Sequence, residues 1–183
     1  LVELQALTNT AGALTVGSSV QKRQKPDSST FIGKGKTETV INQAKELNCD
    51  LIIFNNDISP TQINNIQKAA GEDLKILDRT GLILDIFKKH AKTREAKSQV
   101  QLAQLEYLLP RLTRQWTHLE RQMGGIGTRA GAGETQIEID RRLIRSRISK
   151  LKSELKGIEN QRKIQNHGRE GAYRIALLGY TNA

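Results

Sequence analysis

A glycine-rich stretch followed by a cluster of arginines is the part of the sequence best suited to contact a large anion. Its glycines leave the backbone free to adopt positive φ angles and to lie close against a partner; they are Gly124, Gly125, Gly127, Gly131 and Gly133. Residues 134–147 resemble a helix start, because Glu134 in the first turn suits the helix dipole. Arginines in this segment can bind phosphates through two parallel hydrogen bonds; they are Arg141, Arg142, Arg145 and Arg147.

The end of the chain contains half of a second phosphate-binding pattern. Residues 173–178 are predicted to form a buried strand, and the strand leads into Gly179-Tyr180-Thr181-Asn182-Ala183. A strand followed by Gly-x-x-x-x begins a phosphate-binding loop. The lysine that contacts the phosphates and the hydroxyl that holds Mg²⁺ do not follow, so a nucleotide hydrolase built on this loop is predicted to be inactive in this chain alone.

A third candidate is the turn Gly33-Lys34-Gly35-Lys36, which precedes a predicted helix. Backbone amides and lysines at a helix N-terminus can bind a phosphate. The alternative is an ordinary strand-to-helix turn with solvated lysines, and this interpretation is favoured. The three histidines, at positions 90, 118 and 167, lack the spacing of metal ligands, so no metal site is expected.

The first 90 residues alternate between strand and helix patterns. Strands are predicted over 13–20, 31–32, 50–55 and 75–78. Helices are predicted over 1–8, 37–47, 59–70 and 81–90, with Ser59 and Pro60 as a helix start. Strands separated by helices imply right-handed crossovers and a mainly parallel sheet. The fold class is therefore α/β, with a small sheet and flanking helices.

Residues 91–170 show only helical patterns. One helix is predicted to run to about residue 121 with a bend at Pro110, and another from about 134 to 165. Both have heptad-like apolar spacing: Leu102, Leu105, Leu109, Leu112, Trp116 and Leu119 on the first, and Ile144, Ile148, Leu151, Leu155 and Ile158 on the second. An antiparallel hairpin would bury both seams and place the glycine-rich loop at its tip. The predicted units are 1–90, 91–170 and 171–183.

The charge distribution favours a polyanionic partner. The net charge is +10, and residues 92–170 carry 17 Lys and Arg against 9 Asp and Glu. A basic excess confined to one segment points to nucleic acid, although a solvated helix face is the alternative. Cys49 is the only cysteine, so a reducing compartment is expected. No signal peptide, membrane span or lipidation motif is found, which predicts a cytoplasmic protein.

Several motifs resemble those of the HflX family of ribosome-associated GTPases. They lie at 31–36, 77–87, 107–112, 116–119, 124–136, 139–147 and 179–183. Together they cover essentially the whole chain in the order of the family. One difference lies in the loop, where Ala130-Gly131-Ala132-Gly133 stands in place of the usual Gly-Pro-Gly. The loop is thus one residue longer and lacks its proline.

The resemblance implies the N-terminal part of an HflX-like protein, cut at the start of its GTPase domain. It implies GTP and Mg²⁺ as cofactors of the full-length protein and none for this chain. The implied partner is the large ribosomal subunit, which a monomer would bind through ribosomal RNA near the peptidyl-transferase region, and some relatives split stalled ribosomes under stress. The RNA-binding residues it implies are Gly124, Gly125, Gly127, Thr128, Arg129, Gly131, Gly133, Arg141, Arg142 and Arg145, and the partial GTP-binding loop is Gly179 to Ala183.

Two alternatives of other classes stay open. The hairpin could be a coiled-coil protein-interaction module with a solvated basic face. The α/β unit could be a nucleotide-binding enzyme that uses Gly33 to Lys36. Salt-sensitive binding to ribosomal subunits separates the first alternative from RNA binding, and nucleotide titration tests the second.

Overall fold

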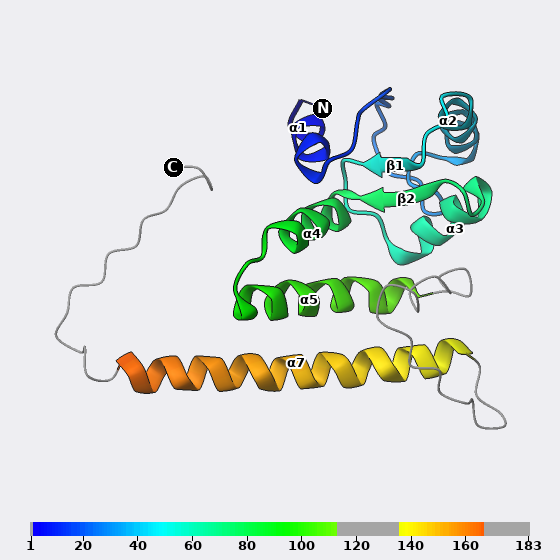
Figure 1. The fold of residues 1–183 in the computed structure, drawn as a ribbon. Helices are drawn as coiled ribbons and strands as arrows, with labels where there is room; N and C mark the ends of the chain where they lie inside the picture. Colours follow the sequence, from blue (N-terminus) through cyan, green and yellow to red (C-terminus); the bar gives the residue numbers. More distant parts are fainter. Residues whose placement is uncertain (1, 113–135, 167–183) are drawn as a thin grey trace.

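The structure is a computed structural model that describes residues 2–112 and 136–166 (Figure 1). Its elements in chain order are α1 (Val2–Ala11), α2 (Lys34–Glu46), β1 (Leu51–Phe54), α3 (Pro60–Ala70), β2 (Lys75–Asp78), α4 (Arg79–His90), α5 (Arg94–Leu108), the 3₁₀ turn η1 (Leu109–Arg111) and α7 (Gln136–Asn166). The elements form a small α/β unit, below which α5 and α7 lie side by side in Figure 1.

The α/β unit is built on two parallel strands. Leu51 lies opposite Lys75 and Phe54 lies opposite Asp78 in the register of β1 and β2. Helices α2 and α3 contribute most of the core around this sheet, and its fully buried side chains include Ile58, Ile63, Ile66 and Leu74. The predicted α/β class and parallel sheet are confirmed.

Helix α3 begins where the sequence predicts it. The Ser59 hydroxyl accepts a hydrogen bond from the Gln62 amide at 3.2 Å, and the Gln62 side chain accepts one from the Ser59 amide at 3.0 Å. This reciprocal capping box satisfies two amides that would otherwise lack partners at the helix start, and Pro60 supplies a fixed φ at the first helical position.

Two predicted strands are wrong. Residues 13–20 form no strand, and Leu14 and Val20 are largely exposed at 84% and 66%. Alternating apolar residues indicate which side chains could share one face of a strand. A strand also needs a second strand beside it to form hydrogen bonds with its backbone. Phe31 forms only an isolated antiparallel bridge with Asp27. Helix boundaries also differ: α1 continues to Ala11, α2 begins at Lys34 rather than at residue 37, and α4 begins at Arg79 rather than at residue 81.

The predicted antiparallel hairpin is present in α5 and α7, which run in opposite directions (Figure 1). The two seams meet in one apolar cluster of Leu102, Leu105, Leu109, Leu112, Ile144, Ile148 and Leu151. Ion pairs join the helices along the same contact: Arg94 with Glu154 at 2.8 Å, Glu106 with Lys152 at 2.7 Å, and Glu95 with Arg162. The seam spacing therefore predicted the packing of this pair correctly.

The first helix of the hairpin ends earlier than predicted. Helix α5 stops at Leu108, and Pro110 lies in η1 rather than in a bent α-helix. Proline has no amide hydrogen to continue the α-helical pattern, and Leu112 after the turn is extended. The predicted continuation towards residue 121, with Trp116 and Leu119, lies outside the described residues.

A buried carboxylate joins the sheet to the hairpin. Asp78, at the end of β2, is completely buried and caps α4 by accepting from the Gly81 amide at 2.8 Å. The same oxygen accepts from the Tyr107 hydroxyl at 2.7 Å, and the other pairs with Arg111 at 3.1 Å. Arg111 also lies over the Tyr107 ring and donates to the Ile58 carbonyl. We call Asp78, Tyr107 and Arg111 the buried triad.

The buried triad predicts a loss of stability at alkaline pH. Burial and the hydrogen bond to Asp78 raise the pKa of Tyr107 above its ordinary value near 10. The unfolded chain can therefore ionise this phenol while the folded chain holds it neutral, so the free energy of unfolding falls as pH rises above about 10. Urea unfolding between pH 8 and 11 should show a smaller decline for Tyr107→Phe than for the wild type. Equal declines would contradict this assignment.

Candidate nucleic-acid interface

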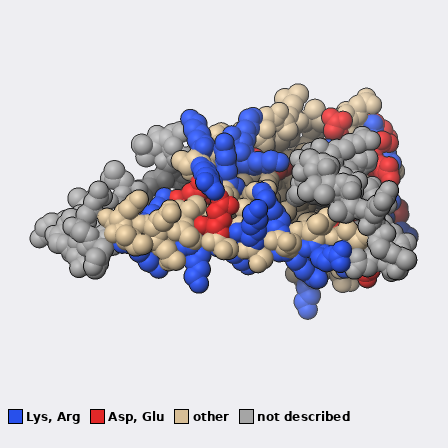
Figure 2. All heavy atoms as spheres, turned by 60° about the horizontal axis from the view of Figure 1, so that its bottom comes forward, with Lys and Arg blue, Asp and Glu red and all other residues tan. Residues whose placement is uncertain are grey.

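The outward face of α7 is the most basic surface formed by a single element. The helix carries nine Lys and Arg against four Asp and Glu. Its apolar seam turns Ile144, Ile148 and Leu151 towards α5, so the charged positions occupy the remaining faces. Figure 2 shows Lys and Arg side chains gathered on this side of the molecule, with Asp and Glu fewer.

Some of these cations are neutralised within the protein. Lys152 and Arg162 pair with carboxylates of α5, as given above. Lys163 pairs with Glu159 at 2.7 Å, and the hydrogen bond from Lys163 lowers the pKa of the Glu159 carboxyl. Exposed pairs of this kind contribute little to stability, but they reduce the charge that α7 offers to a partner.

Three other cations form no ion pair in the described part of the chain, and of these Lys156 lies near enough to Glu159 to help lower the pKa of that carboxyl. Arg145, Lys150 and Lys156 are exposed, and none forms an ion pair with another residue of the ranges 2–112 and 136–166. Arg147 is exposed and has no ion pair in these ranges either, but it donates a hydrogen bond to Gln101 at 3.4 Å. We call Arg145, Lys150 and Lys156 the α7 cation set. At 1.5 Å per residue, Arg145 and Lys156 lie about 16 Å apart along the helix. The set therefore presents separated positive charges suited to successive phosphates of a backbone.

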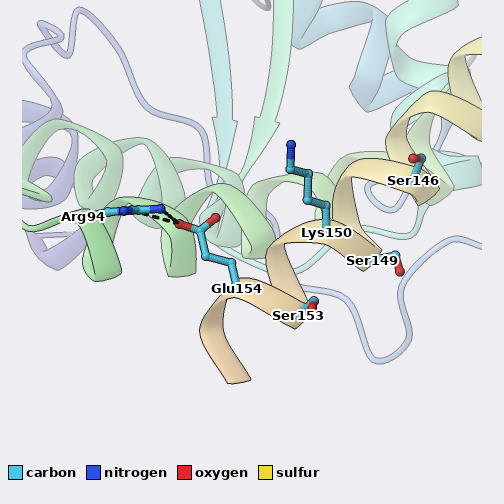
Figure 3. Close-up of a pocket in the computed structure, with 6 residues that line it drawn as sticks. All are labelled: Arg94, Ser146, Ser149, Lys150, Ser153 and Glu154. Atoms are coloured by element: carbon cyan, nitrogen blue, oxygen red, sulfur yellow. Dashed lines mark hydrogen bonds and ion pairs between the residues drawn. The ribbon is translucent and has the colours of Figure 1, made fainter. Parts of the chain in front are cut away.

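A shallow groove beside Lys150 adds hydroxyl groups to this face. Its lining residues are Arg94, Ser146, Ser149, Lys150, Ser153 and Glu154 (Figure 3). Arg94 comes from α5. Its Nε and one terminal nitrogen donate hydrogen bonds to the same carboxylate oxygen of Glu154, at 3.0 and 2.8 Å. Serine hydroxyls and lysine ammonium groups both donate to phosphate oxygens. The groove thus has the donors of a backbone contact and a guanidinium fixed at its edge.

Sequence reasoning missed the residues of this groove. Ser146, Ser149 and Ser153 follow one another at spacings of three and four, opposite the apolar seam, and this spacing was a readable signal for a shared face. Lys150 and Lys156 lie outside the arginine-rich start of the helix, and nothing in their local sequence distinguishes them from other solvated lysines. The sequence does not predict that Arg94 lines this groove. Its place beside Glu154 depends on packing between α5 and α7, and the two residues are 60 positions apart in the chain.

The predicted RNA-contacting arginines differ in their surroundings. Arg145 is exposed and belongs to the α7 cation set. Arg142 is exposed as well, and it takes part in an interaction within the protein. Arg141 is only partly exposed and donates to the Leu112 carbonyl at 3.4 Å. It therefore helps to hold the hairpin together, which makes it a poorer candidate for phosphate contact than Arg145.

The other predicted contacts fall outside the described residues. These are the loop residues Gly124, Gly125, Gly127, Thr128, Arg129, Gly131 and Gly133, and the partial GTP-binding loop from Gly179 to Ala183. Their roles stay predictions.

The turn at Gly33 is described and forms the start of α2. Gly33 has φ of +85°, and a Cβ atom there would lie 2.6 Å from the Arg23 guanidinium. No side chain caps the helix, and Lys34, Gly35 and Lys36 form its first turn. Uncapped amides beside Arg23 and two lysines are compatible with an anion, and this use of the turn stays a prediction.

Other chemistries lack support among the described residues. Residues 2–112 and 136–166 contain no group of three or more His, Cys, Asp or Glu placed to bind a metal ion. None of the helices in these ranges has the length and apolar content that a membrane span requires. The arrangement of cations and hydroxyls on α7 is the best-developed candidate site among the described residues, and its groups are of the kind that donate to phosphate oxygens.

Comparisons with known proteins agree with this architecture. Residues 1–88 match the family model "GTP-binding GTPase N-terminal", and residues 90–169 match "GTP-binding GTPase Middle Region". The solved structure of SsGBP in complex with GDP is similar in fold, with a TM-score of 0.63 and 22% identity over 97% of this chain and 44% of that chain. Fold and family models thus define the class, namely the N-terminal and middle regions of a GTP-binding GTPase.

Curated relatives identify the family more closely. GTPase HflX of Flavobacterium psychrophilum is 50% identical over 182 residues, and GTPase HflX of Escherichia coli K12 is 42% identical over 188 residues. Each match covers all of this chain and 43% of the relative. The chain therefore belongs to the HflX family of GTPases, and it spans less than half the length of these relatives.

Proposed function

We propose that this chain is the ribosome-binding part of an HflX-like GTPase. Through the hairpin it binds ribosomal RNA of the large subunit near the peptidyl-transferase region. In the full-length protein this binding serves to split or rescue stalled ribosomes under stress, with GTP and Mg²⁺ bound by the GTPase domain. We further propose that residues 1–90 form the α/β subdomain, that 91–170 form the basic hairpin, and that 171–183 begin the GTPase domain.

The observation that carries the proposal is the α7 cation set beside the serine-lined groove. Arg145, Lys150 and Lys156 are exposed and form no ion pair within the described ranges. A coiled-coil module with a merely solvated face would need no such concentration of unneutralised charge. Phosphate contacts from Lys and Arg, supported by serine hydroxyls, are the usual way in which proteins are positioned on nucleic acids.

Salt dependence tests the proposal directly. We expect the chain to bind purified large subunits with an affinity that falls steeply with salt, because phosphate contacts release condensed counterions. Three phosphate contacts from the α7 cation set alone would contribute a slope of about −2 to −3 in a plot of log affinity against log salt. Binding that is absent, or that is unchanged between low and moderate salt, would refute ribosomal RNA binding.

A negative prediction accompanies this function. The 183-residue chain should show no GTP hydrolysis above background, because no Gly-Lys-Ser or Gly-Lys-Thr follows the half-motif that begins at Gly179. Phosphate release by the purified chain with GTP and Mg²⁺ is the measurement. Clear turnover would mean that the α/β unit carries catalytic groups of its own and would favour the nucleotide-binding enzyme alternative.

A further inference from the structure

A second basic surface lies where α4 meets α5. Within ten residues of the sequence stand Lys88, Lys89, Lys92, Arg94 and Lys97, which we call the junction cluster. All five are exposed. The junction cluster belongs to neither the arginine-rich start of α7 nor the α7 cation set.

The acidic residues near the junction cluster leave most of its charge uncompensated. Glu95 lies within it but pairs with Arg162. Glu154 of α7 pairs with Arg94. Lys89, Lys92 and Lys97 form no ion pair with any residue of the described ranges. The cluster therefore retains at least three unpaired ammonium groups on the surface.

The same ion pairs fix where the junction cluster sits on the hairpin. Arg94 lies beside Glu154, and Glu95 lies beside Arg162. Along α7, these two positions are about 14 and 26 Å from Arg145. The ion pairs thus fix the position of the junction cluster along α7. Arg94 of the junction cluster and Lys150 of the α7 cation set line the same groove (Figure 3).

The residue types favour duplex RNA as the partner. Proteins that bind single strands stack successive bases on several aromatic side chains. Residues 88–97 contain His90 but no Phe, Tyr or Trp, and α7 contains none of these four residue types. The half-exposed Phe87 stands beside the cluster, so the surface lacks a series of aromatic side chains. Double-stranded RNA is instead recognised through phosphates and sugar hydroxyls at separate places along the helix. Two cationic regions on a rigid helix pair suit this form of recognition.

We infer that the junction cluster is a second RNA-binding surface, which contacts the backbone of an RNA duplex of the large subunit through Lys89, Lys92 and Lys97. The inference rests on the proposed function, since it assumes that the hairpin binds ribosomal RNA. It adds a contact distinct from the tip loop and from the start of α7. The α/β unit then takes part in binding, because α4 supplies part of the surface.

The test compares two triple variants of equal net charge. The junction variant carries Lys89→Gln, Lys92→Gln and Lys97→Gln. The control carries Lys22→Gln, Lys25→Gln and Lys45→Gln, three exposed lysines of the α/β unit outside the cluster. Affinity for large subunits and for a 20-base-pair RNA duplex is measured over a range of salt concentrations, and circular dichroism checks the fold.

The junction variant should lose about tenfold or more in affinity at about 0.1 M salt, and its salt slope should be shallower by about two. The control should stay within about threefold of the wild type. If the wild type binds and the two variants behave alike, only the junction surface is refuted. If the wild type itself does not bind, the proposed function fails as well.

Two further measurements decide the chemistry of the partner. A single-stranded RNA of equal length should compete less well than the duplex, and preference for the single strand would overturn the inference. Vesicles of phosphatidylserine and phosphatidylcholine should bind the wild type and the junction variant equally weakly. If the variant lost vesicle binding but retained RNA binding, the cluster would be a membrane surface and the inference would be wrong.

Discussion

Replacing Arg145, Lys150 and Lys156 with glutamate is expected to reduce the affinity for large ribosomal subunits by at least about 100-fold at about 0.1 M salt. Each change removes one phosphate contact and places a negative charge against the backbone, so attraction turns into repulsion at three points. Co-sedimentation with purified large subunits at several salt concentrations measures the effect. The salt slope of any residual binding should be shallower by about two to three.

The matched control reverses Lys22, Lys25 and Lys45 to glutamate. These lysines are exposed and lie in the α/β unit, outside α4, α5 and α7, and the change in net charge is identical. The control should lose less than about tenfold, an effect of overall charge alone. All three changes on α7 lie at exposed positions, so thermal unfolding should stay near that of the wild type. If the α7 variant bound within threefold of the wild type, the basic face would be merely solvated and the interaction-module alternative would be favoured.

The packing of the hairpin could be predicted because it depends on local periodicity. Leu102 and Leu105 recur at the helical repeat on one segment, and Ile144 and Leu151 do so on the other. A helix with one apolar stripe must bury that stripe, and a second stripe of the same length nearby in the chain is the simplest partner. The parallel pairing of residues 51–54 with 75–78 followed in the same way from a helix between two apolar runs.

Failures occurred where the outcome depended on a partner distant in the chain. The apolar residues at 13–20 favoured a strand, but no strand of the described residues pairs with this segment, and it forms none. The sequence gives no reason to treat Arg141 and Arg145 differently. In the structure, Arg141 donates a hydrogen bond to the Leu112 carbonyl, whereas Arg145 is exposed. The predicted boundary between residues 90 and 91 divides the junction cluster. Its five cations therefore fall in two separate units and do not stand out as one basic surface.

The buried triad is the clearest case of a contact that the sequence does not reveal. Tyr107 and Arg111 stand one helical turn apart, which is an ordinary spacing. Asp78 precedes them by 29 and 33 residues, and nothing in its sequence context distinguishes a helix cap from a buried ion pair. Such contacts depend on how the end of α5 and η1 pack against the end of β2.

Asp78→Ala is expected to lower the free energy of unfolding by about 3–5 kcal/mol, the usual cost of breaking a buried ion pair from one side. The Arg111 side chain is 12% exposed, so without Asp78 its charge stays buried and uncompensated. The Tyr107 hydroxyl and the Gly81 amide lose their acceptor as well, and unsatisfied buried donors add to the cost. Urea unfolding followed by circular dichroism measures the change.

Asp57→Ala provides the control, because Asp57 is an exposed carboxylate that follows β1 and accepts a hydrogen bond from Thr80. It should lower the free energy of unfolding by about 1 kcal/mol or less.

A double-mutant cycle tests the ion pair itself. Asp78→Ala and Arg111→Met should show a coupling energy of about 1.5 kcal/mol or more, because Arg111→Met removes the positive charge that Asp78→Ala leaves unpaired. An Asp78→Ala cost no larger than that of Asp57→Ala would show that the triad does not hold the hairpin to the sheet. The expected large cost would show that the Asp78 carboxylate is a main support of the contact between the sheet and the hairpin.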